Sequence, residues 1–197
     1  MTGPTPHVVV HTAISLDAAT TGFTPDVATF YGLAARWHED VTLAGADTIL
    51  AQEASLASAP PGPGPDPSGP LLAVVDSRSR VTRWEELKSA GHWRDVVRLG
   101  ADDGGRVDLR RALSGLAEQG ANVVRVDSGG ALTGALLAAG LVAELSLLVH
   151  PVLAGGSVPR WYGVEPPPAD ALEPLGHEIL DGGLAWLRYR WATDEAA

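Results

Sequence analysis

The sequence contains no cysteine, and Lys88 is its only lysine. Without cysteine the chain has no disulfide, no thiolate nucleophile and no Cys-ligated zinc or iron–sulfur site. No apolar run approaches the length needed to cross a membrane, and the N-terminus lacks the basic and apolar segments of a signal peptide. These absences predict a cytoplasmic protein without a membrane partner.

Positive charge is also scarce, because 14 Lys and Arg face 24 Asp and Glu, and the formal net charge is −10. This balance disfavours nucleic acid as a partner. An anionic small molecule would need a local cluster of arginines or backbone N–H groups. With 197 residues, of which 45% are hydrophobic, the chain is expected to form one domain over residues 1–197.

Several common motifs are absent from the sequence. It has neither of the glycine-rich fingerprints of Rossmann and P-loop proteins, no G-x-S-x-G nucleophile motif and no H-E-x-x-H zinc motif. His7 and His11 are spaced to share one face of a strand, but two histidines do not make a metal site. No metal is therefore expected.

The hydrophobic periodicity predicts strands and helices in alternation, followed by a β-hairpin. Strands are expected at His7–Ile14, Val41–Ala44, Leu71–Val75, Val96–Leu99, Val123–Val126 and Ala143–His150, and helices at Asp26–Glu39, Gly45–Ser58, Leu109–Gln119 and Ala131–Ala139. Ala59–Pro70 is expected to be a surface loop. The hairpin would join Leu175–Leu180 to Leu184–Trp191 through Asp181-Gly182-Gly183. This order indicates a three-layer α/β/α fold whose central sheet is mostly parallel, with the hairpin adding an antiparallel edge.

Polar residues follow the predicted strands at the positions where ligands bind in open α/β sheets. They are Ser15 and Asp17, Gly45 and Thr48, Ser77 and Arg78, and Asp127 with Gly129 and Gly130. Together they predict a nucleotide site. Each also has a local alternative: Thr48 caps a helix, Asp17 makes an Asx-turn, and Arg78 is simply solvated.

The Gly129-Gly130 pair lies between an apolar strand and the start of a helix. Exposed N–H groups at a helix N-terminus suit an anion such as a phosphate, and small residues let it approach closely. The alternative is an ordinary tight connection in which glycine only provides an unusual φ angle.

Four segments carry a family resemblance. Ser15-Leu16-Asp17 follows the first strand, Leu43–Ala51 reads LAGADTILA, and Val74–Arg78 reads VVDSR. The longest begins VDSGGAL at Val126, continues GLVAEL from Gly140 and ends PVLAGG at Gly156. These segments resemble the S-L-D-G, V-G-x-x-T-V-L-A, D-S and V-E-G-G-x-x-L…G-L-V-D-E-L…P-x-L-x-G-G motifs of the pyrimidine reductase family of riboflavin biosynthesis.

The resemblance implies a dihydrofolate-reductase-like fold and an NADPH-dependent reductase whose small-molecule substrate is a phosphoribosylamino-pyrimidine. It implies cofactor contacts from Gly45, Thr48, Ser77, Arg78, Ser128, Gly129 and Gly130, with Ser77 and Arg78 at the 2′-phosphate. Asp17 and Asp127 would lie next to the reacting atoms, where either could orient a hydroxyl or relay a proton. The family commonly forms homodimers. The apolar strand Ala143–His150 and the hairpin offer a surface for one, unless helices cover it within the monomer.

This sequence departs from the family pattern at several positions. Ala18 stands for the glycine after S-L-D, and Asp127-Ser128 stands for the family's glutamate and first glycine. Gln52–Leu56 replaces a D-D-P-x-L-x-x-R segment, which leaves the substrate phosphate without an obvious partner. No deaminase segment is present. Two alternatives therefore stay open: a reductase of the same fold for another carbonyl, imine or pteridine, and a nucleotide-binding module without catalysis.

Overall fold

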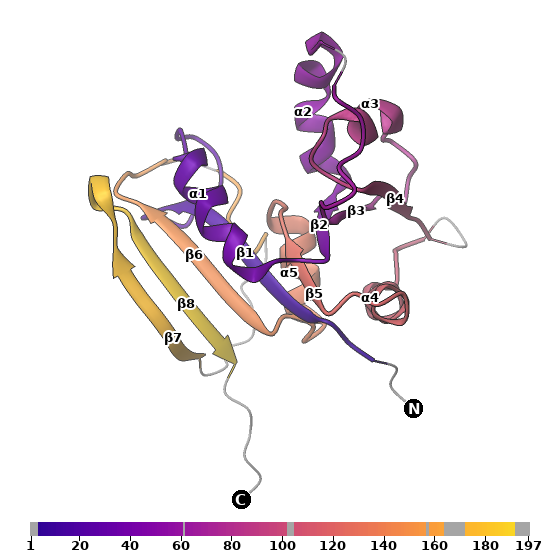
Figure 1. Ribbon diagram of the computed structural model, residues 1–197. Coiled ribbons are helices and arrows are strands. Elements are labelled where there is room, and N and C mark those ends of the chain that lie inside the picture. Colours follow the sequence, from indigo (N-terminus) through magenta and orange to yellow (C-terminus); the bar gives the residue numbers. More distant parts are fainter. Residues whose placement is uncertain (1–3, 61, 102–104, 157, 164–171, 192–197) are drawn as a thin grey trace, which may run out of the picture. The chain divides into compact units, whose positions relative to one another are not determined.

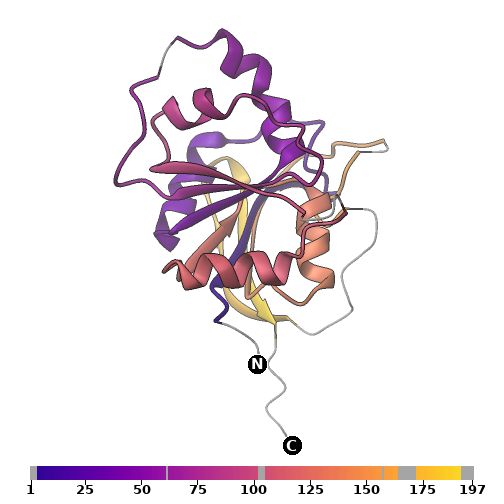
Figure 2. The same cartoon turned by 90° about the vertical axis from the view of Figure 1, so that its right-hand side faces the viewer.

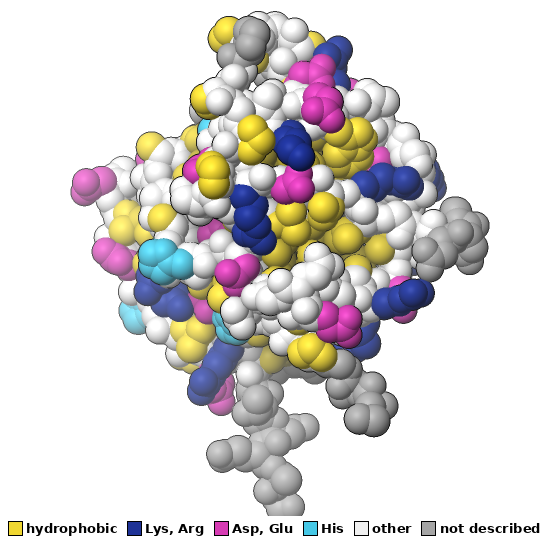
Figure 3. All heavy atoms as spheres, turned by 45° about the vertical axis from the view of Figure 1, so that its right-hand side comes forward, with side chains coloured by type: hydrophobic (Ala, Val, Ile, Leu, Met, Phe, Trp, Pro, Cys, Tyr) yellow, Lys and Arg dark blue, Asp and Glu magenta, His cyan; other side chains and the backbone are white. Residues whose placement is uncertain are grey.

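The computed structural model describes residues 4–60, 62–101, 105–156, 158–163 and 172–191. The chain divides into two compact units. Unit 1 comprises residues 1–6 and 39–128, and unit 2 comprises residues 7–38 and 129–197. Within the described ranges no helix combines the length and the apolar character needed to cross a membrane. On the face drawn in Figure 3, basic and acidic side chains lie interspersed.

Unit 1 is built on parallel strands in the order β4-β3-β2-β5. The strands are β2 (Val41–Gly45), β3 (Leu71–Val75), β4 (Asp95–Leu99) and β5 (Val123–Val126), and the helices are α2 (Ala46–Ser58), α3 (Trp84–Ser89) and α4 (Leu109–Glu118). Helices α2 and α3 lie on one face of these strands and α4 on the other (Figures 1 and 2). Since both faces are covered, the strands read as continuous apolar runs.

Unit 2 is built on strands in the order β1-β6-β8-β7. Its elements are β1 (His7–Ser15), α1 (Val27–Ala34), the 3-10 turn η1 (Ala35–Trp37), α5 (Gly130–Ala138), β6 (Glu144–His150), β7 (Leu172–Ile179), the turn η2 (Asp181–Gly183) and β8 (Ala185–Trp191). Strands β1 and β6 are parallel, whereas β8 and β7 are antiparallel to their neighbours. Helices α1 and α5 lie on opposite faces (Figures 1 and 2).

Each unit therefore has helices on both faces of its strands, and the predicted mixed α/β class with a mostly parallel sheet is confirmed. Asp26 begins α1 as expected, because its carboxylate accepts a hydrogen bond from Thr29 N at 2.9 Å. Three details differ from the prediction. Helix α3 was not expected, and β7 begins at Leu172, ahead of Pro174. The helix predicted to reach Glu39 ends at Ala34 and continues only as the 3-10 turn η1 to Trp37.

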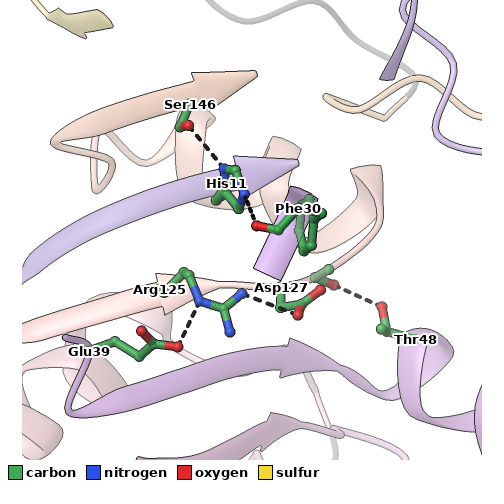
Figure 4. Close-up of polar contacts among 8 residues, drawn as sticks. His11, Phe30, Glu39, Thr48, Arg125, Asp127 and Ser146 are labelled. Atoms are coloured by element: carbon green, nitrogen blue, oxygen red, sulfur yellow. Dashed lines mark hydrogen bonds and ion pairs between the residues drawn. The ribbon is translucent and has the colours of Figure 1, made fainter. Parts of the chain in front are cut away.

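A buried hydrogen-bond chain fixes the interior of unit 2 (Figure 4). The Nε2 atom of His11 lies 3.0 Å from Phe30 O, which can only accept, so Nε2 carries the proton. Nδ1 then accepts from the Ser146 hydroxyl at 2.9 Å. Ser146 in turn accepts from Trp186 Nε1 at 2.9 Å. His11 is thus a core residue joining β1, α1, β6 and β8.

Candidate functional site

The carboxyl ends of the unit 1 strands lie in register. Gly45 of β2 pairs with Val75 of β3, and Val75 pairs with Leu99 of β4. Asp127, which follows β5, donates its N–H to Leu43 O at 2.9 Å. The polar residues that follow β2, β3 and β5 therefore emerge at the same edge of unit 1, as the sequence predicts.

Three of the predicted cofactor residues form one cluster at this edge. Gly45 N donates to Ser128 Oγ at 3.1 Å, and Ser128 Oγ lies 3.2 Å from Thr48 Oγ1 (Figure 4). Helix α2 begins at Ala46 without a side-chain cap, so the alternative that Thr48 caps it is wrong. The first-turn N–H groups of α2 and two hydroxyls thus point to a polar or anionic partner.

A short turn presents Ser77 and Arg78 at the end of β3. The Asp76 side chain is buried and organises the turn by accepting Val81 N at 2.9 Å. Burial raises the pKa of Asp76, but N–H groups of the turn and the charge of Arg98 lower it more, so Asp76 is a carboxylate. Ser77 is half-buried and Arg78 is exposed, as the alternative of a solvated Arg78 expects.

Asp127 belongs to a partly buried charge cluster around the buried Arg125 (Figure 4). Arg125 Nε lies 2.7 Å from Glu39 Oε1, and Arg125 Nη1 lies 3.1 Å from Asp127 Oδ2. Burial lowers the pKa of Arg125, but the two carboxylates raise it more, so the guanidinium stays charged. Arg125 therefore holds the Asp127 carboxylate in a fixed orientation at the end of β5.

Asp17 of unit 2 ties the end of β1 to the loop after β6. Its carboxylate accepts from Ser15 Oγ at 2.6 Å and from the N–H groups of Ala154 and Gly155 at 3.0 Å each. The Asx-turn alternative is therefore wrong. These hydrogen bonds lower the pKa of Asp17 to about 2, with the Ser15 bond as the largest cause. A group ionised at neutral pH has no proton to give, which favours orientation over proton relay for Asp17.

The two glycines at the start of α5 have different surroundings. Gly129 is the exposed N-cap, with φ −71°, and a Cβ added there would meet no atom within 4 Å. Gly130 is buried, and a Cβ there would lie 2.1 Å from Arg160 O. Neither glycine has a positive φ, so the alternative based on unusual φ angles is wrong.

The expectation that Gly130 leaves room for a cofactor therefore needs correction. The backbone that approaches Gly130 closely is that of Arg160–Gly163, and Gly134, one turn later, makes room for Tyr162 O in the same way. Gly129 keeps its open space. Of the pair, only Gly129 has space around it that a side chain could occupy.

Sequence reasoning missed several polar residues of these sites. Arg125 and Glu39 anchor Asp127, and Arg160 Nη1 donates to Asp17 O at 2.6 Å. An arginine inside the apolar run VVRV was a usable signal, because a charge in a buried strand needs partners. Arg160 gave no signal, since its contact is made across 143 residues of sequence. In the described ranges no His, Cys, Asp or Glu cluster could hold a metal ion.

Comparison with known proteins identifies the family. The family model for the RibD C-terminal domain matches residues 6–185. The chain belongs to this family. Riboflavin biosynthesis protein RibD of Escherichia coli is 33% identical over an alignment of 101 residues; the match covers 44% of this chain and 28% of that protein. The match therefore spans less than a third of the E. coli protein.

Solved structures show the fold that this RibD-type chain adopts. Rib7, the riboflavin biosynthesis reductase of Saccharomyces cerevisiae, superposes with a TM-score of 0.66 at 21% identity, over 95% of this chain and 90% of that one. Dihydrofolate reductase from Enterococcus faecalis, solved with NADP(H), gives 0.59 at 11% identity, over 95% and 97%. The predicted dihydrofolate-reductase-like fold is confirmed.

Proposed function

We propose that this chain is an NADPH-dependent reductase that transfers hydride to the ribose C1 of 5-amino-6-(5-phosphoribosylamino)uracil. The observation that carries the proposal is the RibD C-terminal family match over residues 6–185. The relatives support it by name: RibD acts in riboflavin biosynthesis, Rib7 is a reductase, and the dihydrofolate reductase was solved with NADP(H). The cofactor would supply the hydride, and the protein would bind and orient.

The donor groups of unit 1 suit the anionic parts of such a cofactor. We assign Gly45, Thr48 and Ser128 to one contact region, because their N–H and hydroxyl groups cluster at the start of α2. Ser77 and Arg78 are assigned to the 2′-phosphate, since a guanidinium fork matches a phosphate. In unit 2 the N–H groups at the start of α5 are assigned to the pyrophosphate, with Gly129, not Gly130, as the glycine that leaves room for it.

The two acidic residues receive orienting roles. Arg125 fixes the Asp127 carboxylate, which can accept a hydrogen bond from a substrate hydroxyl. Asp17 already accepts from Ser15 Oγ, Ala154 N and Gly155 N, so its task is to hold the loop after β6. Because the Asp17 carboxylate already accepts three hydrogen bonds, it has little remaining capacity to accept one from a substrate.

NADPH consumption with the proposed substrate tests the assignment. Turnover supports the pyrimidine reductase. Binding of NADPH without turnover supports a nucleotide-binding module, and a panel of other carbonyl, imine and pteridine substrates then tests the remaining reductases. The panel is needed because the Gln52–Leu56 stretch of α2 contains no arginine for the substrate phosphate. Equal rates with the phosphorylated and dephosphorylated substrate would show that no group binds that phosphate.

Arg78→Ala tests the cofactor preference. A charge-assisted contact to phosphate contributes about 1.5–3 kcal/mol, so NADPH should bind roughly 10- to 100-fold more weakly. NADH, which lacks the 2′-phosphate, should be affected little. Titration of both cofactors measures this, and equal losses would contradict the assignment of Arg78.

We also propose a homodimer formed through an apolar face of the unit 2 sheet. Register places Leu145 opposite Tyr189, and Leu147 opposite Leu187, on the same face of β6 and β8. Leu145 is buried within the monomer, whereas Leu147, Leu187 and Tyr189 are only half-buried. The residues of the other face, such as Leu148 and Trp186, are covered within the monomer. A second copy of the chain would cover the half-exposed face.

A further inference from the structure

Arg98 lies at the carboxyl end of β4 and has a fixed position. Its Nε donates to Asp76 O at 2.9 Å, which holds the guanidinium beside the end of β3. The guanidinium also bends over Gly100, since a Cβ on Gly100 would lie 3.1 Å from Arg98 Nη2 and 3.2 Å from its central carbon. Arg98 is thus preorganised at the edge where the strands of unit 1 end.

The two Nη groups of the Arg98 guanidinium have hydrogen-bond donors that no described residue uses. Arg98 is exposed, and among the described residues its two Nη groups have no hydrogen-bond or ion-pair partner. It lines a cavity of about 500 Å3 between β4 and α4, together with Arg106. Asp108, at the same cavity, uses its carboxylate to cap α4 through Arg111 N at 3.0 Å.

Arg98 is close to the proposed 2′-phosphate position. Its anchor, Asp76, precedes Arg78 by two residues, so the Cα atoms of Asp76 and Arg78 are at most about 7 Å apart. Two arginines therefore lie near the end of β3 in a chain whose net charge is −10. Two guanidinium groups suit a phosphate dianion better than one does.

We propose that Arg98 is a second residue that selects NADPH over NADH, by donating from its Nη groups to the 2′-phosphate. This inference rests on the proposed function. The alternative is structural: Arg98 only ties β4 to β3 and offsets the charge of the buried Asp76. The two roles differ in one measurable respect, because a structural tie does not distinguish NADPH from NADH.

The test compares Arg98→Ala with Arg94→Ala. Arg94 also donates to backbone carbonyls, those of Asp40 and Gly69, but it lies at the other end of β4. Calorimetric titration uses NADPH, NADH and adenosine 2′,5′-bisphosphate. Arg98→Ala should weaken NADPH and the bisphosphate by roughly 10- to 100-fold and change NADH by less than about twofold. Arg94→Ala should change none of the three.

A second variant keeps the arginine. In Gly100→Ala the new Cβ would lie 3.1 Å from Arg98 Nη2, so the end of the Arg98 side chain must give way by a few tenths of an ångström. Gly100→Ala should therefore lower NADPH affinity in the same direction as Arg98→Ala but by less, without loss of charge. Circular dichroism confirms that both variants are folded.

The outcomes separate this inference from the proposed function. Turnover by the wild type together with an unchanged preference for NADPH in Arg98→Ala overturns the role of Arg98 and leaves the reductase intact. Equal losses for NADPH and NADH also overturn it, in favour of the structural tie. A wild type that binds neither cofactor overturns both proposals.

Discussion

Gly129 and Gly130 are neighbours in sequence, yet they serve different purposes. A side chain on Gly130 would collide with the backbone of Arg160–Gly163, whereas a side chain on Gly129 would enter open space. Sequence alone cannot separate them, because the segment that packs on Gly130 lies about 30 residues further along the chain. What the sequence does predict is that the pair lies directly before or at the start of α5, since the helix was expected from Ala131 and begins at Gly130.

Gly130→Ala should destabilise the protein by about 1–3 kcal/mol, because overpacking forces the backbone of Arg160–Gly163 to move. Gly129→Ala is the matched control, since its φ of −71° suits alanine and its surroundings are open. It should leave stability nearly unchanged and weaken NADPH. Denaturant unfolding and cofactor titration measure the two effects; a stable Gly130→Ala would contradict the packing role.

Ala18 occupies a backbone conformation that favours glycine. Its φ is +63°, and it stands where the pyrimidine reductase family has the glycine of S-L-D-G. An alanine in this region is strained by about 1 kcal/mol. Glycine removes this strain but increases the conformational entropy of the unfolded chain, which offsets part of the gain. Ala18→Gly should therefore raise the free energy of unfolding by about 0.5 kcal/mol. A lower unfolding midpoint in urea would refute this.

At the scale of elements, hydrophobic periodicity predicted most strands and helices, because burial on both faces leaves a clear sequence pattern. The exceptions have physical causes. Helix α3 has six residues, no side-chain cap and one buried residue, Leu87, so its pattern is weak. Pro174 was expected to precede the hairpin strand, but β7 is an edge strand with a register shift after Pro174 and so tolerates a proline.

The candidate site was predictable only in part, for a related reason. Strand ends can be recognised locally, and the cluster of Gly45, Thr48 and Ser128 follows from them. The partners that orient the acids, such as Arg125 for Asp127, depend on tertiary contacts. Likewise Arg98 becomes a candidate only when its bond to Asp76 is known.

The link between β1 and the loop after β6 should depend on pH through Asp17. Its pKa is about 2 in the folded state, below the usual 3.8, so the carboxylate stabilises the fold fully above about pH 4. This contribution should decrease as the pH falls towards 2. Asp17→Asn should thus be less stable than the wild type at neutral pH, with a difference that shrinks on acidification.

Chemical unfolding at several pH values measures that difference. Asp181→Asn, which removes an exposed carboxylate from the hairpin turn, controls for the loss of one surface charge. A constant difference between Asp17→Asn and the wild type down to about pH 2 would show that the Asp17 carboxylate does not provide the link.

At the scale of the whole molecule, the half-exposed apolar face of β6 and β8 predicts association. Sedimentation at micromolar concentration should give twice the 20.4 kDa mass of one chain. Leu187→Glu places a charge in the middle of this face and should yield monomers with an intact fold, because Leu187 is only half-buried. A monomeric wild type would contradict the dimer.

The charge cluster around Arg125 has a consequence for the chain path of unit 1. Most of this unit is one continuous segment, residues 39–128. Arg125 binds Glu39, the first residue of that segment, and Asp127, the residue before its last. One guanidinium thus closes the segment into a loop whose beginning and end are held by the same cation.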